Sequence, residues 1–208
     1  KSLYYGSIRC PLDFWAPWRL EDEDETLARR LGLGEIGKEM GDLLHPARLL
    51  DILQNFSLFS TNKKKHRIKI IPRFQQYEGA NKIVERVKEG RVKKGLIWHF
   101  QGSGKSLLMV FAAQKLRRAP ELKSPTVIVL VDRIDLDTQI SGTFNASDIP
   151  NVEATENIRD LQKMLQHDTR KIIISMIHKF RDAQPNMNTR DNIIVLVDEA
   201  HRTQEGDL

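Results

Sequence analysis

Aliphatic runs of strand length alternate with amphipathic helical segments from about residue 68 onward. Runs such as Val127–Val131 carry no polar alternation, which is typical of strands buried on both faces. Strands of this kind, separated by helices, indicate a parallel sheet covered by helices. We therefore predict an α/β fold with a mainly parallel sheet flanked by helices. Its elements in chain order are helix 75–89, strand 96–100, helix 105–118, strand 126–131, helices 134–141 and 157–166, and strands 172–176 and 193–197.

The first part of the chain lacks this alternation and predicts a small helical linker segment. A helix is expected over 47–56, because Pro46 suits a first turn and leucines recur there at helical spacing. A second candidate helix covers 24–31. We place a domain boundary near residue 66, so that 1–66 form the linker segment and 67–208 form the main domain.

Composition narrows the class of protein. The chain carries 33 Lys and Arg against 28 Asp and Glu, a formal charge of +5, and this bias favours a polyanionic partner. The basic runs at 63–67 and 91–94 are either solvated loops or contacts to such a partner. No aliphatic run is long enough to cross a bilayer, so we expect no membrane partner. The start lacks an apolar signal core and Cys10 is the one cysteine, which fits a reducing cytoplasm.

A phosphate-binding loop lies between the expected strand 96–100 and helix 105–118. It consists of Gln101, Gly102, Ser103, Gly104, Lys105 and Ser106. Glycines let backbone N–H groups surround phosphate oxygens at a helix N-terminus, whose dipole favours anions. Lys105 would neutralise the β and γ phosphates, and the Ser106 hydroxyl would bind Mg²⁺. His99 stands where the general pattern has a glycine. The context predicts a RecA-like P-loop NTPase lobe that uses ATP and Mg²⁺.

A pair of carboxylates follows the last aliphatic strand, in the tetrapeptide Asp198–Glu199–Ala200–His201. Beside a P-loop, Asp198 would hold Mg²⁺ and Glu199 would act as general base toward the attacking water. In isolation this tetrapeptide could equally be a strand end with an acidic helix cap. Asp198 lies 93 positions after Lys105 (198 minus 105), which leaves room for the strands and helices of one lobe.

Arg73 and Gln76 lie upstream of the loop, in the segment Arg73–Phe–Gln–Gln–Tyr77. A glutamine amide can accept from the adenine N6 amine and donate to N7, which would give a preference for ATP. Gln75 and Gln76 are adjacent, so the pattern does not decide between them. Polar residues that simply open helix 75–89 are the alternative.

Four segments together resemble the R (restriction) subunit of type I restriction-modification enzymes, whose motor belongs to helicase superfamily 2. They are RFQQYEGANK (73–82), WHFQGSGKS (98–106), VDRIDLDTQ (131–139) and VDEAHRTQEG (197–206). Phe14–Arg19 and Leu49–Phe59 resemble the same subunit's connection between nuclease and motor, so the resemblance covers most of the chain. Within it, Gln76 is favoured over Gln75 because the family's glutamine directly precedes the aromatic residue.

The resemblance implies an ATP-dependent translocase that pumps double-stranded DNA before cleavage, in complex with methyltransferase and specificity subunits. It implies a role for His201 in coupling nucleotide state to a second lobe, although a structural hydrogen bond is the alternative. It also implies DNA-backbone contact near Arg133, which could instead cap a helix. The family's nuclease site, second lobe and arginine finger have no counterpart in these 208 residues. We therefore expect a fragment that starts in the linker and stops within the first RecA-like lobe.

Two other functions stay open at this point. The chain could be the lobe of a different superfamily 2 motor, such as a repair or remodelling helicase. It could also be a nucleotide-gated DNA-binding module that hydrolyses nothing by itself.

Overall fold

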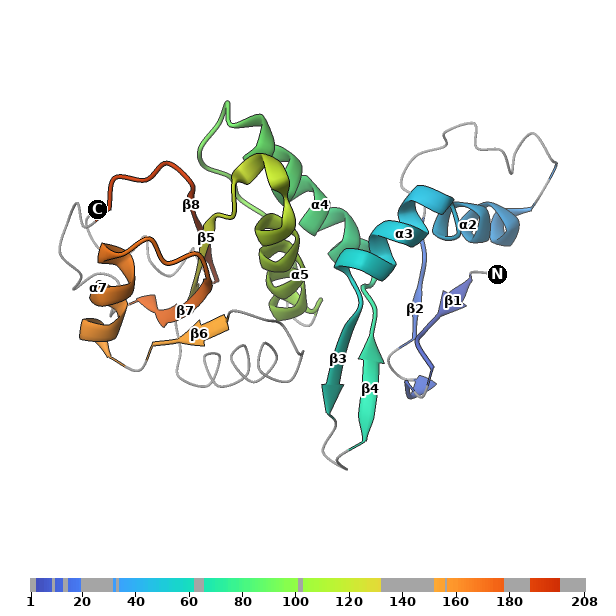
Figure 1. Ribbon diagram of the computed structural model, residues 1–208. Coiled ribbons are helices and arrows are strands. Elements are labelled where there is room, and N and C mark those ends of the chain that lie inside the picture. The colour runs from blue at the N-terminus through green and yellow to red at the C-terminus, as the bar shows by residue number, and fades with distance from the viewer. Residues whose placement is uncertain are drawn as a thin grey trace.

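A computed structural model describes residues 3–8, 10–12, 15–19, 32, 34–61, 66–100, 103–131, 152–155, 157–177 and 188–198 (Figure 1). The elements of the first part are β1 (Tyr4–Tyr5), β2 (Ala16–Pro17), α2 (Glu35–Leu43), α3 (Pro46–Asn55), β3 (Leu58–Thr61) and β4 (Arg67–Ile70). They are followed by α4 (Phe74–Glu89), α5 (Lys105–Arg118), the 3-10 helix η2 (Pro120–Leu122), β5 (Thr126–Val131), β6 (Val152–Ala154), α7 (Ile158–Gln166), β7 (Ile172–Met176) and β8 (Ile193–Val197).

The main sheet is parallel and has the strand order β6-β7-β5-β8. In the register, Val127 of β5 lies between Ile172 of β7 and Ile194 of β8. Parallel neighbours need a crossover connection, and α7 (Ile158–Gln166) provides it between β6 and β7. This architecture confirms the predicted α/β fold.

Both faces of β5 are buried. Successive side chains of a strand point to opposite sides of the sheet, so each face packs against different neighbours. Val127, Val129 and Val131 pack into a core with α4 and α5, whereas Ile128 and Leu130 pack with Leu161 and Leu165 of α7. Figure 1 shows the α4–α5 pair and α7 on opposite sides of the sheet. The uniformly aliphatic sequence of the strand thus reflects two apolar environments.

The expected strand 96–100 does not form. These residues have no regular secondary structure, and Leu96 and Trp98 are 79% and 89% exposed. Among the described strands, β8 is therefore an edge strand, and its Val195 and Val197 are 42% and 40% exposed. The expected helices 24–31 and 134–141 lie outside the described residues.

The first part of the chain packs directly onto α4 and α5. Trp18 and Phe56 are fully buried in the same core cluster as Phe111 of α5. The expected helix 47–56 is confirmed by α3, whereas α2 was not predicted and contains no buried residue. The antiparallel hairpin β3–β4 spans the predicted domain boundary near residue 66, and the division into two units stays a prediction.

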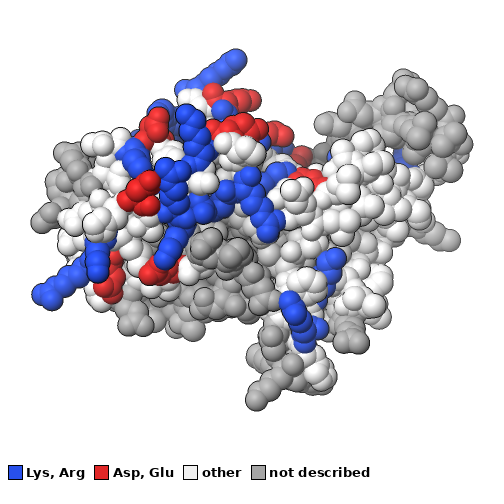
Figure 2. Space-filling view, viewed as in Figure 1, with Lys and Arg blue, Asp and Glu red and all other residues white. Residues whose placement is uncertain are grey.

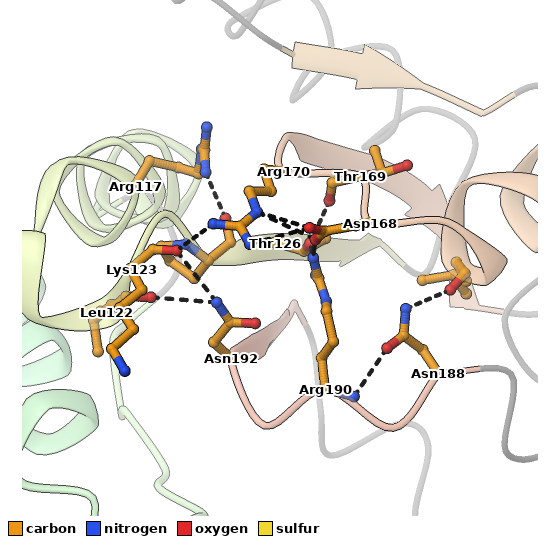
Figure 3. Close-up of polar contacts among 12 residues, drawn as sticks. Arg117, Leu122, Lys123, Thr126, Asp168, Thr169, Arg170, Asn188, Arg190 and Asn192 are labelled. Carbon is orange, nitrogen blue, oxygen red and sulfur yellow. Dashed lines mark hydrogen bonds and ion pairs between the residues drawn. The ribbon is translucent and has the colours of Figure 1, made fainter.

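Side chains tie together the loops that precede three strands of the sheet (Figure 3). Asp168, before β7, accepts hydrogen bonds from Arg170 at 3.0 to 3.2 Å and from Arg190, which precedes β8. Arg190 also donates to the hydroxyl of Thr126 at the start of β5. Arg117, near the end of α5, donates to the Pro125 carbonyl at 2.7 Å. The amino ends of β5, β7 and β8 are thereby held in one arrangement.

Within the described part of the chain, no helix is both long enough and apolar enough to cross a membrane.

Candidate nucleotide-binding site

The P-loop leads into α5, as the sequence predicted. Gly104 is the N-cap residue of α5, and Lys105 and Ser106 occupy its first turn. The first backbone N–H groups of a helix have no partner inside the helix. No acidic residue lies in the first turn, and among the described residues no side chain caps it. The start of α5 therefore presents backbone N–H groups and a positive dipole end, which suit an anion.

Gly104 adopts a conformation that only glycine tolerates well. Its φ is +83°, in the left-handed region. A Cβ atom at this position would also overlap Nε2 of Gln76. The glycine thus permits both the turn into α5 and the close approach of a side chain from α4.

Gln76 bridges α4 and the P-loop. Its Oε1 accepts a hydrogen bond from the Arg73 backbone N–H at 2.8 Å, which caps the start of α4. Its Nε2 donates to the Gly104 carbonyl at 3.1 Å and lies 3.5 Å from the Ser103 carbonyl. The side chain is buried, with 2% exposure. The structure therefore brings Arg73, Gln76, Ser103 and Gly104 together, and it uses the Gln76 amide for internal contacts.

Lys105 brings a positive charge close to His99. Partial burial and the Lys105 charge together hold the pKa of His99 below its usual value. Ser103 is fully buried, and its hydroxyl has no hydrogen-bond partner among the described residues. A buried hydroxyl is normally paired. The loop therefore contains both a positive charge and an unused polar group.

Asp198 follows β8 directly and is buried, with 6% exposure. Its backbone N–H donates to the Leu130 carbonyl at 2.9 Å, which places it at the carboxyl end of β5. α5 and β5 are each about 20 Å long, and the end of α5 is tied to the start of β5 through Arg117. The start of α5 therefore lies toward the same end of the sheet as Asp198.

These residues fit a nucleotide with Mg²⁺. Phosphate oxygens suit the backbone N–H groups at the start of α5, the Lys105 ammonium, and the Ser103 hydroxyl, which has no partner among the described residues. Ser106 and Asp198 carry oxygen atoms of the kind that Mg²⁺ prefers as ligands, and they lie at the same end of the sheet. Four other residues of the predicted site, Gly102, Arg133, Glu199 and His201, lie outside the described residues.

Sequence reasoning missed a polar network that joins α3, α4 and α5. Asp51 of α3 accepts from Lys115 of α5 at 2.6 and 2.7 Å, and Lys115 also donates to Asn81 of α4 at 2.5 Å. Tyr77 and Arg48 make side-chain contacts with the same group. Partners such as Asp51 and Lys115 are 64 positions apart, and no local pattern signals a contact over that separation.

Known proteins align with most of this chain. Residues 75–208 match the SWI2/SNF2 ATPase family. The chain is 35% identical to the type I restriction enzyme HindI endonuclease subunit of Haemophilus influenzae, in an alignment covering 97% of this chain and 20% of that protein. It is 34% and 31% identical to the putative type I restriction enzyme MjaIXP and MjaVIIIP endonuclease subunits of Methanocaldococcus jannaschii. Those alignments cover 98% and 81% of this chain and 22% and 19% of the relatives.

The chain thus spans about a fifth of the length of these relatives. The similarity confirms the resemblance to the R subunit of type I restriction enzymes. The family match covers α4, the P-loop, the parallel sheet and Asp198, which are the elements that build the candidate site. The chain belongs to the SWI2/SNF2 ATPase family.

Proposed function

We propose that this chain is the first ATP-binding lobe of the DNA-translocating motor in a type I restriction endonuclease R subunit. The observation that carries the proposal is the start of α5, where a left-handed Gly104 precedes Lys105 and Ser106 at the same end of the sheet as the buried Asp198. The similarity to type I restriction endonuclease subunits supports the choice of motor.

The residues have distinct roles in ATP hydrolysis. Gly102, Ser103 and Gly104 surround the phosphates, and Lys105 neutralises charge that builds on them during transfer. Ser106 and Asp198 would hold Mg²⁺, and the ion would supply Lewis-acid stabilisation of the phosphate oxygens. Glu199 accepts a proton from the attacking water.

Two further roles concern the nucleotide base and the DNA. Arg73 and Gln76 contact the nucleotide from α4, with Gln76 favouring adenine. His201 couples nucleotide state to a second lobe, and Arg133 contacts the DNA backbone.

The partners follow from the same assignment. The lobe acts on double-stranded DNA in a cytoplasmic complex with methyltransferase and specificity subunits. The net charge of +5 suits a polyanion. In the view of Figure 2, Lys and Arg side chains gather over the middle of the molecule. DNA cleavage belongs to a nuclease domain outside these residues.

Titration with a fluorescent ATP analogue in the presence of Mg²⁺ tests the site. Lys105→Ala should weaken binding at least tenfold, because a charge that meets the phosphates is lost. Lys163→Ala is the matched control, since Lys163 lies exposed on α7. Equal affinity of wild type and Lys105→Ala, with both proteins folded, would show that the nucleotide binds elsewhere.

A further inference from the structure

The segment before residue 60 contacts the start of α4 at several points. The Tyr5 hydroxyl donates to the Pro72 carbonyl, just before the helix. The Trp18 ring packs edge-on against Phe74, with 5.0 Å between ring centroids. These contacts fix the chain on both sides of Arg73, the N-cap residue of α4.

Tyr77 is the residue of this turn that meets the segment most fully. Its ring centroid lies 4.8 Å from that of Phe56 and 5.7 Å from that of Trp18, and both of these side chains are fully buried. Its hydroxyl makes polar contacts with Asp51 and Arg48 of α3. Burial and the negative charge of Asp51 together raise the pKa of Tyr77, so the phenol stays neutral.

The same α3 helix is fastened to the P-loop helix. Asp51 accepts a hydrogen bond from the Lys115 ammonium. Burial by itself would raise the pKa of the Asp51 carboxyl, but the hydrogen bonds and the positive charge of Lys115 lower it below its usual value. The pair borders a cavity of about 630 Å³ between α3, α4 and α5. Water in this cavity screens the attraction, so the pair fixes geometry more than it adds stability.

Gln76 is adjacent to Tyr77 in the sequence, and its amide reaches the P-loop carbonyl of Gly104 at 3.1 Å. Two neighbouring residues in one turn of α4 therefore make two different contacts. Tyr77 packs against the segment before residue 60, and Gln76 donates to the phosphate-binding loop. We propose that Tyr77 is a positioning residue for the nucleotide site, through which α3 and its neighbours hold Gln76 against the P-loop. The inference rests on the proposed function.

Nucleotide titration of the full 208-residue chain tests this role, with ATP and GTP measured in parallel. Tyr77→Phe keeps the ring and removes the hydroxyl, and we expect ATP binding to weaken roughly two- to tenfold, the range of one hydrogen bond. Asp51→Asn should weaken it in the same direction. Tyr4→Phe is the matched control, because Tyr4 is 58% exposed, and it should bind ATP like the wild type.

A double-variant comparison separates positioning from general stabilisation. If Tyr77 acts through Gln76, Tyr77→Phe should weaken ATP binding in the wild type and have little further effect in Gln76→Ala. Thermal unfolding of every variant shows how much stability changes. An equal loss in both backgrounds, or a loss no larger than that of Tyr4→Phe, overturns the inference and leaves the ATP site intact. Failure of the wild type to bind ATP overturns the proposed function as well.

Discussion

Gly104 has two separate reasons to be a glycine. Its φ of +83° strains any residue with a Cβ, and the nearby Gln76 amide leaves no room for that atom. We predict that Gly104→Ala lowers the free energy of unfolding by about 2 to 4 kcal/mol, the sum of backbone strain and steric overlap. The measurement is equilibrium unfolding in urea.

Gly90→Ala provides the control for this prediction. Gly90 is also left-handed, with φ +63°, but open space surrounds it. Its substitution should cost only the strain, about 1 kcal/mol. Equal losses for Gly90→Ala and Gly104→Ala would mean that the Gln76 side chain moves away freely, and that its contact with the loop is weak.

The choice between two glutamines shows what a residue pattern leaves open. Gln75 and Gln76 have the same chemistry, and the sequence distinguished them only through family resemblance. In the structure, Gln76 is buried and reaches Ser103 and Gly104. A helix turns by about 100° per residue, so only one of two neighbours can face the loop. The adenine preference of Gln76 stays a prediction.

Elements that ended where expected carry strong local signals. α5 and β5 have the predicted bounds because glycines, prolines and uniform aliphatic runs mark their ends. The prediction of a strand over 96–100 was wrong, although most residues of this segment are apolar. Apolar composition favours a strand, but a strand also needs a partner for its backbone, and that partner lies elsewhere in the chain.

The Arg190 guanidinium links the loops that precede β7 and β8 to the start of β5. Arg190 is 19% exposed and joins Asp168 to Thr126 (Figure 3). We predict that Arg190→Ala lowers the free energy of unfolding by about 0.5 to 1.5 kcal/mol, since Asp168 keeps Arg170 as a partner and is itself exposed. Urea unfolding measures the change.

Arg159→Ala is the comparison, because Arg159 is exposed on α7. It should change stability by less than about 0.5 kcal/mol. If both arginine variants unfold at the same urea concentration as the wild type, the Arg190 contacts do not stabilise the sheet, and packing alone holds the loops.

At the scale of the molecule, the largest sheet of the described residues is a single four-stranded parallel one. We predict that the chain by itself hydrolyses ATP very slowly, with little stimulation by DNA, and does not cut DNA. In phosphoryl-transfer enzymes, an arginine supplied from across the site, in cis or by a partner, is worth roughly 10³ to 10⁵ in rate. Without a facing lobe, water also stays near the phosphates and weakens electrostatic stabilisation.

A phosphate-release assay with and without duplex DNA checks this, with Glu199→Gln beside the wild type. Brisk turnover that DNA stimulates and Glu199→Gln abolishes would show that this chain, alone or self-associated, completes the catalytic site. Weak, salt-sensitive binding of DNA is the expected behaviour of a single lobe.

The sequence by itself determined the α/β class, the P-loop helix, the buried strands and the carboxylate after β8. Each depends on periodicity or on a motif within a few neighbouring residues, where local conformation and burial leave a readable pattern. Only the tertiary structure shows that the Gln76 amide reaches the Gly104 carbonyl, that 96–100 forms no strand, and that Trp18 and Asp51 lie against Tyr77. These contacts join residues that are far apart in the sequence, 28 positions in the case of Gln76 and Gly104, and only the packing of the first part of the chain against α4 and α5 brings them together.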